Sequence, residues 1–382
     1  MLSYSLSDPE VITVWEKSLE REIRASDPLL DPASGLIGKS PNALIIEDDE
    51  LNTTPGGTIR RKIKYQLQSR GRAGSEKLKG HEDHYETATF DVTLNTIRNA
   101  AGISEPIQQQ WISENAMDES RDSLADWAAT RLGFTAHVHA AGIPITDEAY
   151  RLHNAVAAIN SSYLLRPNGK AAGALLESDR FDLPLLIRAQ QKVKMLRPKI
   201  RPATTPWGQC YVVFISPEQS AALQQDDSVW YAQMMGALQG GNMKSGVWTR
   251  ALGKYKDFLI MESDHVPPGL NSGETKLKAT TRRAWVGGAG ALTMIFGRGW
   301  RVAPGYAPNR WQWTRESEDY NQSNAVAVTS IVGVKRPRFT RPSEASAREN
   351  GVLVIETYAD LDGIDSADAY KPWTDAGLTI EA

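Results

Sequence analysis

The sequence predicts a mixed α+β fold, in which strands and helices follow one another without regular alternation. Two runs of alternating apolar and polar residues, Thr58–Gln68 and Glu86–Asn95, have the pattern of strands. A long segment with helical periodicity follows them, from about Glu105 to Leu132. The second half holds short apolar runs bounded by glycine and proline, and it shows neither a βαβ order nor an internal repeat.

Composition favours an ordinary globular chain that folds over nearly its whole length. Its 382 residues exceed the usual size of one domain, and its glycines and prolines are spread throughout. With 43 Lys and Arg against 46 Asp and Glu, the chain is slightly acidic, which argues against a dedicated nucleic-acid binder. Cys210 is the only cysteine, so no disulfide can form within the chain, and we expect a buried thiol beside the strand at Tyr211.

Neither secretion nor membrane insertion is expected. The first residues, MLSYSLSDPE, lack a basic leader and an apolar signal core. The longest apolar stretch, Ala284–Phe296, is interrupted by glycines and is too short to cross a bilayer.

The N-terminal region predicts one amphipathic helix followed by an arm. The helix begins near Ser7, where Ser-Asp-Pro-Glu supplies a capping box. Its apolar face consists of Ile12, Trp15, Leu19 and Ile23. Residues 28–41 are broken by prolines and glycines but remain apolar, so we expect them to lie along another surface.

The two alternating runs predict a long two-stranded ribbon with a charged, glycine-rich tip, SRGRAGSEKLKGHED. Its apolar face consists of Ile59, Ile63, Tyr65, Leu67, Ala88, Phe90, Val92 and Leu94. An isolated ribbon is at best marginally stable in water, so something must cover this face. Covering it contributes on the order of 10 kcal/mol before ordering costs, and either the same chain or a neighbouring copy can supply the cover.

Further elements follow in the remainder of the chain. The long helix has Ser104 as its cap, Pro106 in its first turn and Gly133 as its stop. Shorter helices are expected after Thr146, at Asp182–Leu196 and around Glu218–Gln225. The predicted strands are Tyr211–Ile215, Phe258–Glu262, Arg283–Val286, Ala325–Val334 and Val352–Tyr358.

Several patterns resemble catalytic or ligand sites, and a structural interpretation is favoured for each. His81 and His84, beside acidic neighbours, have a metal-ligand composition, but a ribbon tip is usually a solvated loop. His137 and His139 have no adjacent acidic partner for a shared site on a strand. The glycines 287, 288 and 290 lack the spacing of a phosphate-binding loop and favour close helix packing.

The aromatic and charged segments of the second half leave two alternatives open. Trp300, Tyr306, Trp311 and Trp313 can stack on sugars or bases, but aromatic clusters also anchor interfaces, which we favour. A basic stretch, Lys335, Arg336, Arg338, Arg341 and Arg348, precedes an acidic terminus. It is either a solvated surface or a contact with another subunit or nucleic acid. No G-x-S-x-G elbow is present.

The order of these parts resembles the major capsid proteins of tailed phages with the HK97-type fold, and more narrowly the family typified by the coliphage N4 capsid protein. The resemblance covers about residues 10–340, and the segment beyond Phe339 departs from it. It is carried by Trp15, NALIIEDDEL (42–51), Gly57, GSEKLKGHED (74–83), DVTLNTIRNA (91–100), LADWAA (124–129), YVVFISPEQSAAL (211–223), RRAWVGGAGAL (282–292) and DYNQSNAVAVTSIVGVKRPRF (319–339).

The resemblance implies a division of the chain and a function in assembly. The expected parts are an N-terminal arm (1–50), an extended loop (51–100), a peripheral domain with a spine helix (101–208), an axial domain (209–324), and a return to the peripheral domain with a C-terminal extension (325–382). Hexamers and pentamers would tile an icosahedral shell around double-stranded DNA in the virion, after folding in the host cytoplasm. No cofactor, metal, membrane or catalytic residue is implied.

The expected partners are first of all copies of the chain itself. We expect neighbour contacts from the ribbon face (Ile63, Tyr65, Phe90, Val92) and from the tip charges (Arg70, Arg72, Lys77, Lys79, Glu82, Asp83). Portal, scaffolding or decoration proteins and weak, non-specific contact with packaged DNA are further partners. The alternatives are an encapsulin-like nanocompartment and, in another class, a carbohydrate-active or metal-dependent enzyme that uses the Trp-rich segment or the His81 cluster.

Overall fold

The computed structural model describes most of the chain. The described residues are 9–25, 27–53, 55–64, 67, 70–82, 85–103, 116–206, 208–226, 251–299, 309–318, 323–340, 346–361, 364–365 and 370–381. Ser7, Tyr65, Asp83, His84, Ser104, Pro106, Trp300, Tyr306 and Arg341 therefore lie outside them.

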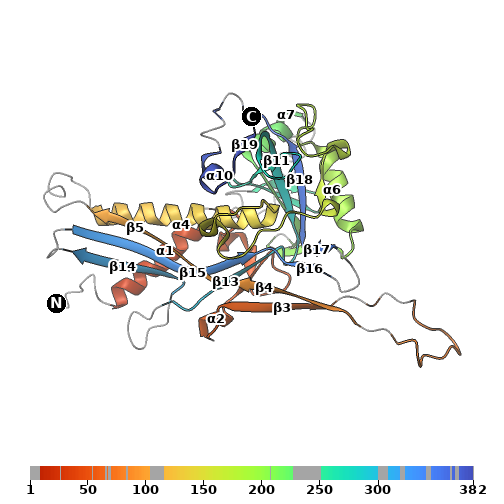
Figure 1. The fold of residues 1–382 in the computed structure, drawn as a ribbon, viewed down its shortest axis with the longest axis horizontal. Coiled ribbons are helices and arrows are strands. Elements are labelled where there is room, and N and C mark those ends of the chain that lie inside the picture. Colours follow the sequence, from red (N-terminus) through yellow and green to blue (C-terminus); the bar gives the residue numbers. More distant parts are fainter. Residues whose placement is uncertain are drawn as a thin grey trace, which may run out of the picture.

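Two mixed sheets form the body of the molecule, and they confirm the α+β class (Figure 1). The six-stranded sheet has the order β1 (Ile37–Gly38), β2 (Ile45–Asp48), β13 (Leu292–Phe296), β15 (Ser323–Lys335) and β14 (Trp311–Glu318), with β5 (Asn95–Ile103) also paired to β15. The nine-stranded sheet has the order β6 (Leu164–Leu165), β18 (Val352–Tyr358), β12 (Leu277–Gly287), β8 (Gly208–Ile215), β10 (Phe258–Glu262) and β9 (Ala251–Tyr255). Beside this path, β11 (Pro268–Leu270) and β19 (Ile380–Glu381) pair with β12, and β7 (Ala203–Thr205) pairs with β8.

Two short two-stranded sheets and the helices complete the fold. The ribbon is β3 (Thr58–Lys64) with β4 (Thr87–Thr93), and β16 (Arg338–Thr340) pairs with β17 (Ala347–Glu349). The helices are α1 (Pro9–Ala25), α2 (Glu50–Thr53), α4 (Ala116–Ala141), α5 (Glu148–Arg151), α6 (Leu183–Met195), α7 (Pro217–Asp226) and α10 (Lys371–Asp375). Three single 3₁₀ turns lie at Pro32–Ser34, Ser161–Tyr163 and Pro167–Gly169. The predicted strands and the α6 and α7 helices are confirmed.

Helix α4 lies along the six-stranded sheet and reaches the larger one (Figure 1). Leu124, Ala128 and Leu132 are buried in the main core, as the helical stripe predicted. The predicted stop at Gly133 is wrong, because α4 continues to Ala141. Gly133 is a packing glycine: a Cβ there would lie 2.7 Å from both Asp27 Oδ2 and His265 Cδ2.

The end of α4 is instead set by Gly142 and a buried arginine. Gly142 has φ +69°, the left-handed conformation that ends helices. Arg336 donates to the carbonyls of His139 and Ala140 at 3.1 and 3.3 Å, so it satisfies two acceptors that a helix end leaves free. His137 and His139 therefore stand on a helix and not on a strand.

The N-terminal helix and arm are tied to the body by both apolar and charged contacts. Leu19 and Ile23 of α1 are buried, as are Leu29 and Leu36 of the arm. This confirms that the arm lies along another surface. Arg310 donates to Glu47 and to Asp49, and it also pairs with Glu20 on α1 at 3.3 Å. Three parts of the chain thus meet at one guanidinium.

The glycine-rich turn after β12 packs closely but precedes a strand, so the expected helix there is wrong. A Cβ on Gly287 would lie 2.5 Å from Leu44, and one on Gly288 would lie 2.3 Å from the Arg201 carbonyl. The following residues form β13, which pairs in parallel with β2. Strand β13 is buried on both faces and apolar except for Thr293, and its periodicity cannot be distinguished from that of a buried helix.

Sheet membership does not follow the expected division of the chain. β13 and β14, within the segment expected to be axial, belong to the six-stranded sheet with β5 and β15. β18, within the expected C-terminal return, lies inside the nine-stranded sheet between β6 and β12. The boundaries 208/209 and 324/325 therefore do not separate the two sheets. Within the described residues, no helix combines the length and apolar character needed to span a membrane.

Candidate assembly surface

The ribbon β3–β4 is anchored at its base in the chain's own core. Ile59, Phe90 and Val92 are buried in a cluster with Ile295 and Phe339. The Phe90 and Phe339 rings meet edge to face, with 5.1 Å between centroids. At the base of the ribbon, the same chain therefore supplies the cover, and Phe90 and Val92, which we expected to contact a neighbour, are buried there.

Polar contacts fix the direction of the ribbon. Asn154 Oδ1 accepts from the Thr93 amide at 3.0 Å, and its Nδ2 donates to the Thr93 carbonyl at 2.8 Å, so this side chain acts like a partner strand. Lys335 Nζ donates to the Asp91 carbonyl at 2.6 Å. Across the ribbon, Arg60 binds Asp91 through two bonds of 2.8 Å, which lower the pKa of that exposed carboxyl.

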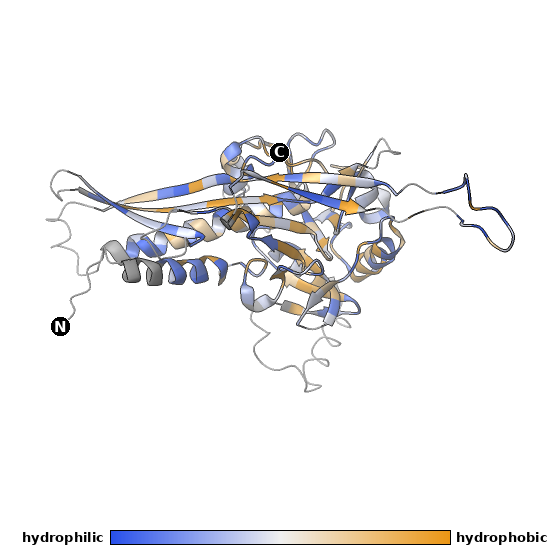
Figure 2. Cartoon of the chain, turned by 90° about the horizontal axis from the view of Figure 1, so that it is seen from below, coloured by the Kyte–Doolittle hydropathy of each residue, from blue (hydrophilic) through white to orange (hydrophobic). Residues whose placement is uncertain are grey.

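The distal part of the ribbon projects away from the body (Figure 1). Figure 2 shows this projecting loop as mostly hydrophilic, with an isolated hydrophobic stretch. Leu67, Leu78 and Tyr85 are 55%, 62% and 66% exposed. Large apolar side chains held this far out have little to cover them in their own chain, which is typical of a contact surface.

The charged residues of the tip fall into two groups. Arg70 and Arg72 bind Glu76 at 2.9 and 3.3 Å. Lys77 and Lys79 are exposed on either side of Leu78, and no carboxylate among the described residues lies within 4 Å of them. Leu67, Leu78, Arg70, Arg72, His81 and Glu82 line a shallow open hollow of about 700 Å³.

The predicted contact residues thus separate by position. Ile63 is half-buried against the cluster at the base. Arg70, Arg72, Lys77, Lys79 and Glu82 are exposed at the tip. Sequence reasoning placed Leu67 on the apolar face but did not select Leu67, Leu78 or Tyr85 as contacts. The Lys-Leu-Lys triplet at 77–79 was the available signal, since a leucine between two lysines in a glycine-rich loop has no core to enter.

A buried polar cluster joins the arm, α4 and the nine-stranded sheet. Ser263 Oγ lies 3.1 Å from His137 Nε2 and 3.4 Å from Asp27 Oδ2, which resembles a hydrolase triad. Trp285 Nε1 donates to His137 Nδ1 at 2.9 Å, so in the neutral ring the proton is on Nε2. A ring protonated there cannot take the serine proton.

The electrostatics of this cluster agree with a structural role. Asp27 is fully buried, and burial alone would raise its pKa, but the imidazoles of His137 and His265 outweigh burial and lower it. Burial lowers the pKa of His265. Asp27 also accepts from the Leu29 amide at 2.7 Å, which fixes the start of the arm.

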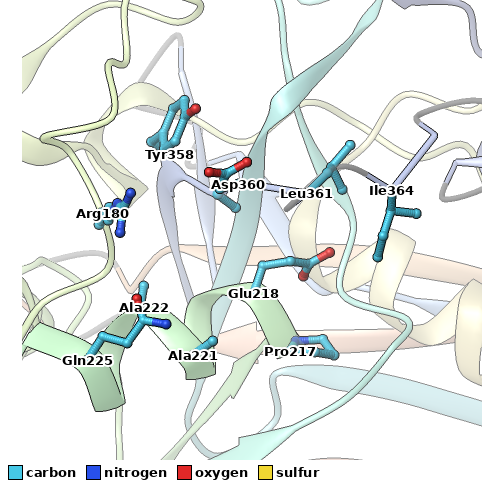
Figure 3. Close-up of a pocket in the computed structure, with 11 residues that line it drawn as sticks. Arg180, Pro217, Glu218, Ala221, Ala222, Gln225, Tyr358, Asp360, Leu361 and Ile364 are labelled. Atoms are coloured by element: carbon cyan, nitrogen blue, oxygen red, sulfur yellow. The ribbon is translucent and has the colours of Figure 1, made fainter.

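The described pocket near the C-terminal segment also lacks a catalytic constellation (Figure 3). It encloses about 410 Å³ between α7 and residues 358–361 and 364, and Asp360, Leu361 and Ile364 face Glu218 across it. Its described lining holds no serine, cysteine, histidine or lysine. Arg282 binds Glu218 at 2.5 Å and, against the effect of burial, lowers the pKa of that carboxyl, which therefore stays ionised.

The aromatic, basic and cysteine residues that the sequence singled out, where they are described, have structural roles within the fold. Trp311 is fully buried and Trp313 packs against the same core, so the interface interpretation is wrong for Trp311. Arg336 of the basic stretch is buried and binds the buried Glu349 at 2.9 Å, so this residue is internal. The described residues contain no group of three or more His, Cys, Asp or Glu side chains suited to a metal ion. Cys210 is buried, as predicted, 3.2 Å from Thr205 Oγ1.

Comparison with known proteins shows which family has this architecture. The model of the phage capsid protein family matches residues 5–361. The capsid of Ralstonia phage GP4 superposes with a TM-score of 0.69 at 20% identity, over 87% of this chain and 92% of that chain. The capsid of cyanophage Pam1 gives 0.63 at 16%, over 86% and 92%. The head of Helicobacter pylori bacteriophage KHP40 gives 0.57 at 12%, over 85% and 89%.

These structures share the HK97-type fold with this chain. A search of curated protein sequences found no relative. A capsid protein has its place in the virion and works by assembly. The chain belongs to the phage capsid protein family and is a structural protein of the virion, not an enzyme.

Proposed function

We propose that this protein is the major capsid protein of a tailed phage and that it assembles into hexamers and pentamers of an icosahedral shell around double-stranded DNA. The observation that carries this is a ribbon fixed at its base by Asn154 and Phe339, with an exposed apolar and basic tip. A stiff projection with an uncovered end suits a contact with the next copy in a ring.

The energetics of the tip support repeated, modest contacts. Burying Leu67, Leu78 and Tyr85 against a neighbour contributes roughly 1.5–3 kcal/mol each before ordering costs. Each subunit would give one tip and receive one, so closure of a ring and then of a shell multiplies a weak contact. Ile63, Arg70, Arg72, Lys77, Lys79 and Glu82 remain in the proposed interface, together with Tyr85.

We propose a revised division of the subunit, in which each domain is built on one of the two sheets. The six-stranded sheet with α4 would be the peripheral domain, and the nine-stranded sheet with α6 and α7 the axial domain. On this division, β18 makes the C-terminal segment part of the axial domain. The order of motifs at residues 42–51, 74–83 and 211–223 supports placement in the N4-type branch. Portal, scaffolding or decoration proteins would be further partners.

An encapsulin-like compartment is the second candidate because it would share the fold. The family match to phage capsid proteins favours the virus shell. Neighbouring genes separate the two: terminase and portal genes accompany a phage capsid, whereas genes for cargo enzymes accompany a compartment.

The tip contact is tested by changing Leu78→Ser and comparing it with Leu176→Ser. Both leucines are 62% exposed, but Leu176 is not on the ribbon. Losing one buried leucine per contact should raise the protein concentration needed for assembly about tenfold or more, since 1.4 kcal/mol is a factor of ten. Electron microscopy and light scattering measure shell formation.

Leu176→Ser should assemble like the wild type, which controls for the loss of a leucine. Deleting residues 69–83 should leave a folded subunit that forms no normal shells. Unchanged assembly of both tip variants would refute the proposed contact, and a wild-type protein that stays monomeric under all conditions would refute the proposed function.

A further inference from the structure

One segment is strongly basic although the chain as a whole carries a net charge of −3. Residues 183–217 contain six Lys and Arg and no Asp or Glu. Two of the six are already engaged: Lys192 Nζ donates to the Leu164 carbonyl at 2.7 Å, and Lys194 binds Asp257 at 2.5 Å. Contacts within the chain therefore explain only part of the local excess of positive charge.

Three of the remaining cations gather in the segment between α6 and β7. Arg197, Lys199 and Arg201 are exposed, whereas Ile200 between them is buried. Arg197 Nη1 donates to the carbonyls of Leu196 and Met195 at 3.2 and 3.4 Å. Among the described residues, no carboxylate lies within 4 Å of any of these three cations, so their charges are not neutralised within the chain. We call Arg197, Lys199 and Arg201 the basic strip.

The backbone of the strip is held rigidly by contacts on several sides. Tyr211 Oη donates to the Ile200 carbonyl at 3.1 Å, and the Ala289 amide donates to the Arg201 carbonyl at 2.8 Å. The Arg348 guanidinium donates to the Arg197 carbonyl, so a fourth cation adjoins the strip. Pro198 and Pro202 restrict it further. The fixed backbone thus keeps these like charges close together, which favours a partner that supplies several negative charges.

We propose that the basic strip is a contact site for the phosphate backbone of double-stranded DNA. This rests on the proposed function, because a shell around DNA brings this polyanion to every subunit. Arg and Lys are the usual phosphate ligands, and guanidinium groups bind phosphate through two bonds. A strip of three cations gives weak, sequence-independent contact, and the net negative charge of the subunit keeps the total attraction low.

The test measures binding of a fluorescein-labelled duplex to the unassembled subunit over a range of salt concentrations. In R197Q/K199Q/R201Q, the slope of log K against log salt should become shallower by about 2.7, which is 0.9 for each lost phosphate contact. The control K17Q/K276Q/K371Q removes the same charge from exposed lysines outside the strip and should keep most of the slope. R197K/R201K keeps the charges and should keep the slope.

The outcomes distinguish a failure of the proposed DNA contact from a failure of the proposed assembly function. The triple variant should show wild-type circular dichroism and still form shells, because the ribbon is unaltered. Equal slopes for the strip and control variants, or no salt-dependent binding by the wild type, would overturn the proposal. A contact with protein would instead centre on the exposed Met195 next to the strip. If M195S and the strip variant both lost assembly while DNA binding was unchanged, the strip would be a subunit interface and the proposal would be wrong.

Discussion

Gly133 stands in the middle of α4 because the helix passes Asp27 and His265 too closely for a side chain. In an exposed helix, replacing glycine by alanine gains up to about 1 kcal/mol. Here the added Cβ would lie 2.7 Å from a buried carboxylate oxygen and from an imidazole carbon. The close approach lets the arm, α4 and Ser263 share one polar cluster.

Gly133→Ala should therefore destabilise the subunit. Overpacking costs of about 1–3 kcal/mol exceed the gain in helix propensity, so we expect a net loss of about 1–2 kcal/mol in the free energy of unfolding. Urea unfolding of the unassembled subunit measures it. Ser123→Ala, on the exposed side of the same helix, should be neutral or slightly stabilising. A Gly133→Ala variant as stable as Ser123→Ala would contradict the packing role.

At the scale of elements, the ribbon combines a fixed base with an exposed end. Asn154 pairs with both backbone groups of Thr93, where β4 ends and an unpaired amide would otherwise be buried. Gly333 on β15 allows the close approach, since a Cβ there would lie 2.3 Å from the Thr93 carbonyl oxygen. The direction of the ribbon thus depends on two residues far away in the sequence.

Asn154→Ala should loosen the ribbon without unfolding the sheets. Leaving the Thr93 amide and carbonyl unsatisfied costs roughly 1–3 kcal/mol. Hydrogen exchange should become about tenfold faster or more in β3 and β4 and stay unchanged in β8 and β10. Asn160→Ala removes an amide that bonds Ala347 and Ser162 instead, so its effect should stay near those residues. Equal protection of the ribbon in Asn154→Ala and wild type would rule out this anchor.

At the scale of the whole molecule, local patterns could be predicted from the sequence and distant pairings could not. The alternation in β3 and β4, and Asp182 before α6, whose side chain accepts from the Leu185 amide, are signals within a few residues. Strand β18 pairs with β12, about seventy residues earlier, and with β6, and no local pattern specifies these partners. The local sequence favours an interface for Trp311 and Phe90. Both are buried within the chain, because their burial depends on residues that are distant in sequence.

The candidate site divides in the same way. Its charged tip and apolar strands were recognisable from composition and period. The sequence does not show which of the apolar residues remain exposed. Phe339 and Ile295, which are distant in sequence, cover Phe90 and Val92 but do not reach Leu78. The result is a subunit whose own core ends at the ribbon base, so that assembly begins where intrachain packing stops.

Acid sensitivity of the whole subunit follows from the buried end of α4. His139 is buried, its Nε2 lies 3.3 Å from the Arg151 carbonyl, and burial lowers its pKa to about 3 from an ordinary value of 6.5. The folded state therefore keeps this imidazole neutral, while the unfolded chain takes up a proton below about pH 6.5. The contribution to stability is complete above pH 6.5 and is lost progressively as the pH falls toward 3. The lowered pKa of His265 acts in the same direction.

The free energy of unfolding of the unassembled subunit should thus fall by at least about 1.4 kcal/mol between pH 7.5 and 5.5, and by about as much again by pH 4.5. Urea titrations at these pH values measure it, and the lowered pKa of Asp27 keeps that buried carboxylate ionised over this range. His139→Gln keeps a donor for the Arg151 carbonyl but cannot titrate, so its loss should be smaller by about 1.4 kcal/mol at pH 5.5. A wild-type subunit equally stable at pH 7.5 and 5.5 would show that this imidazole is not held neutral in the fold.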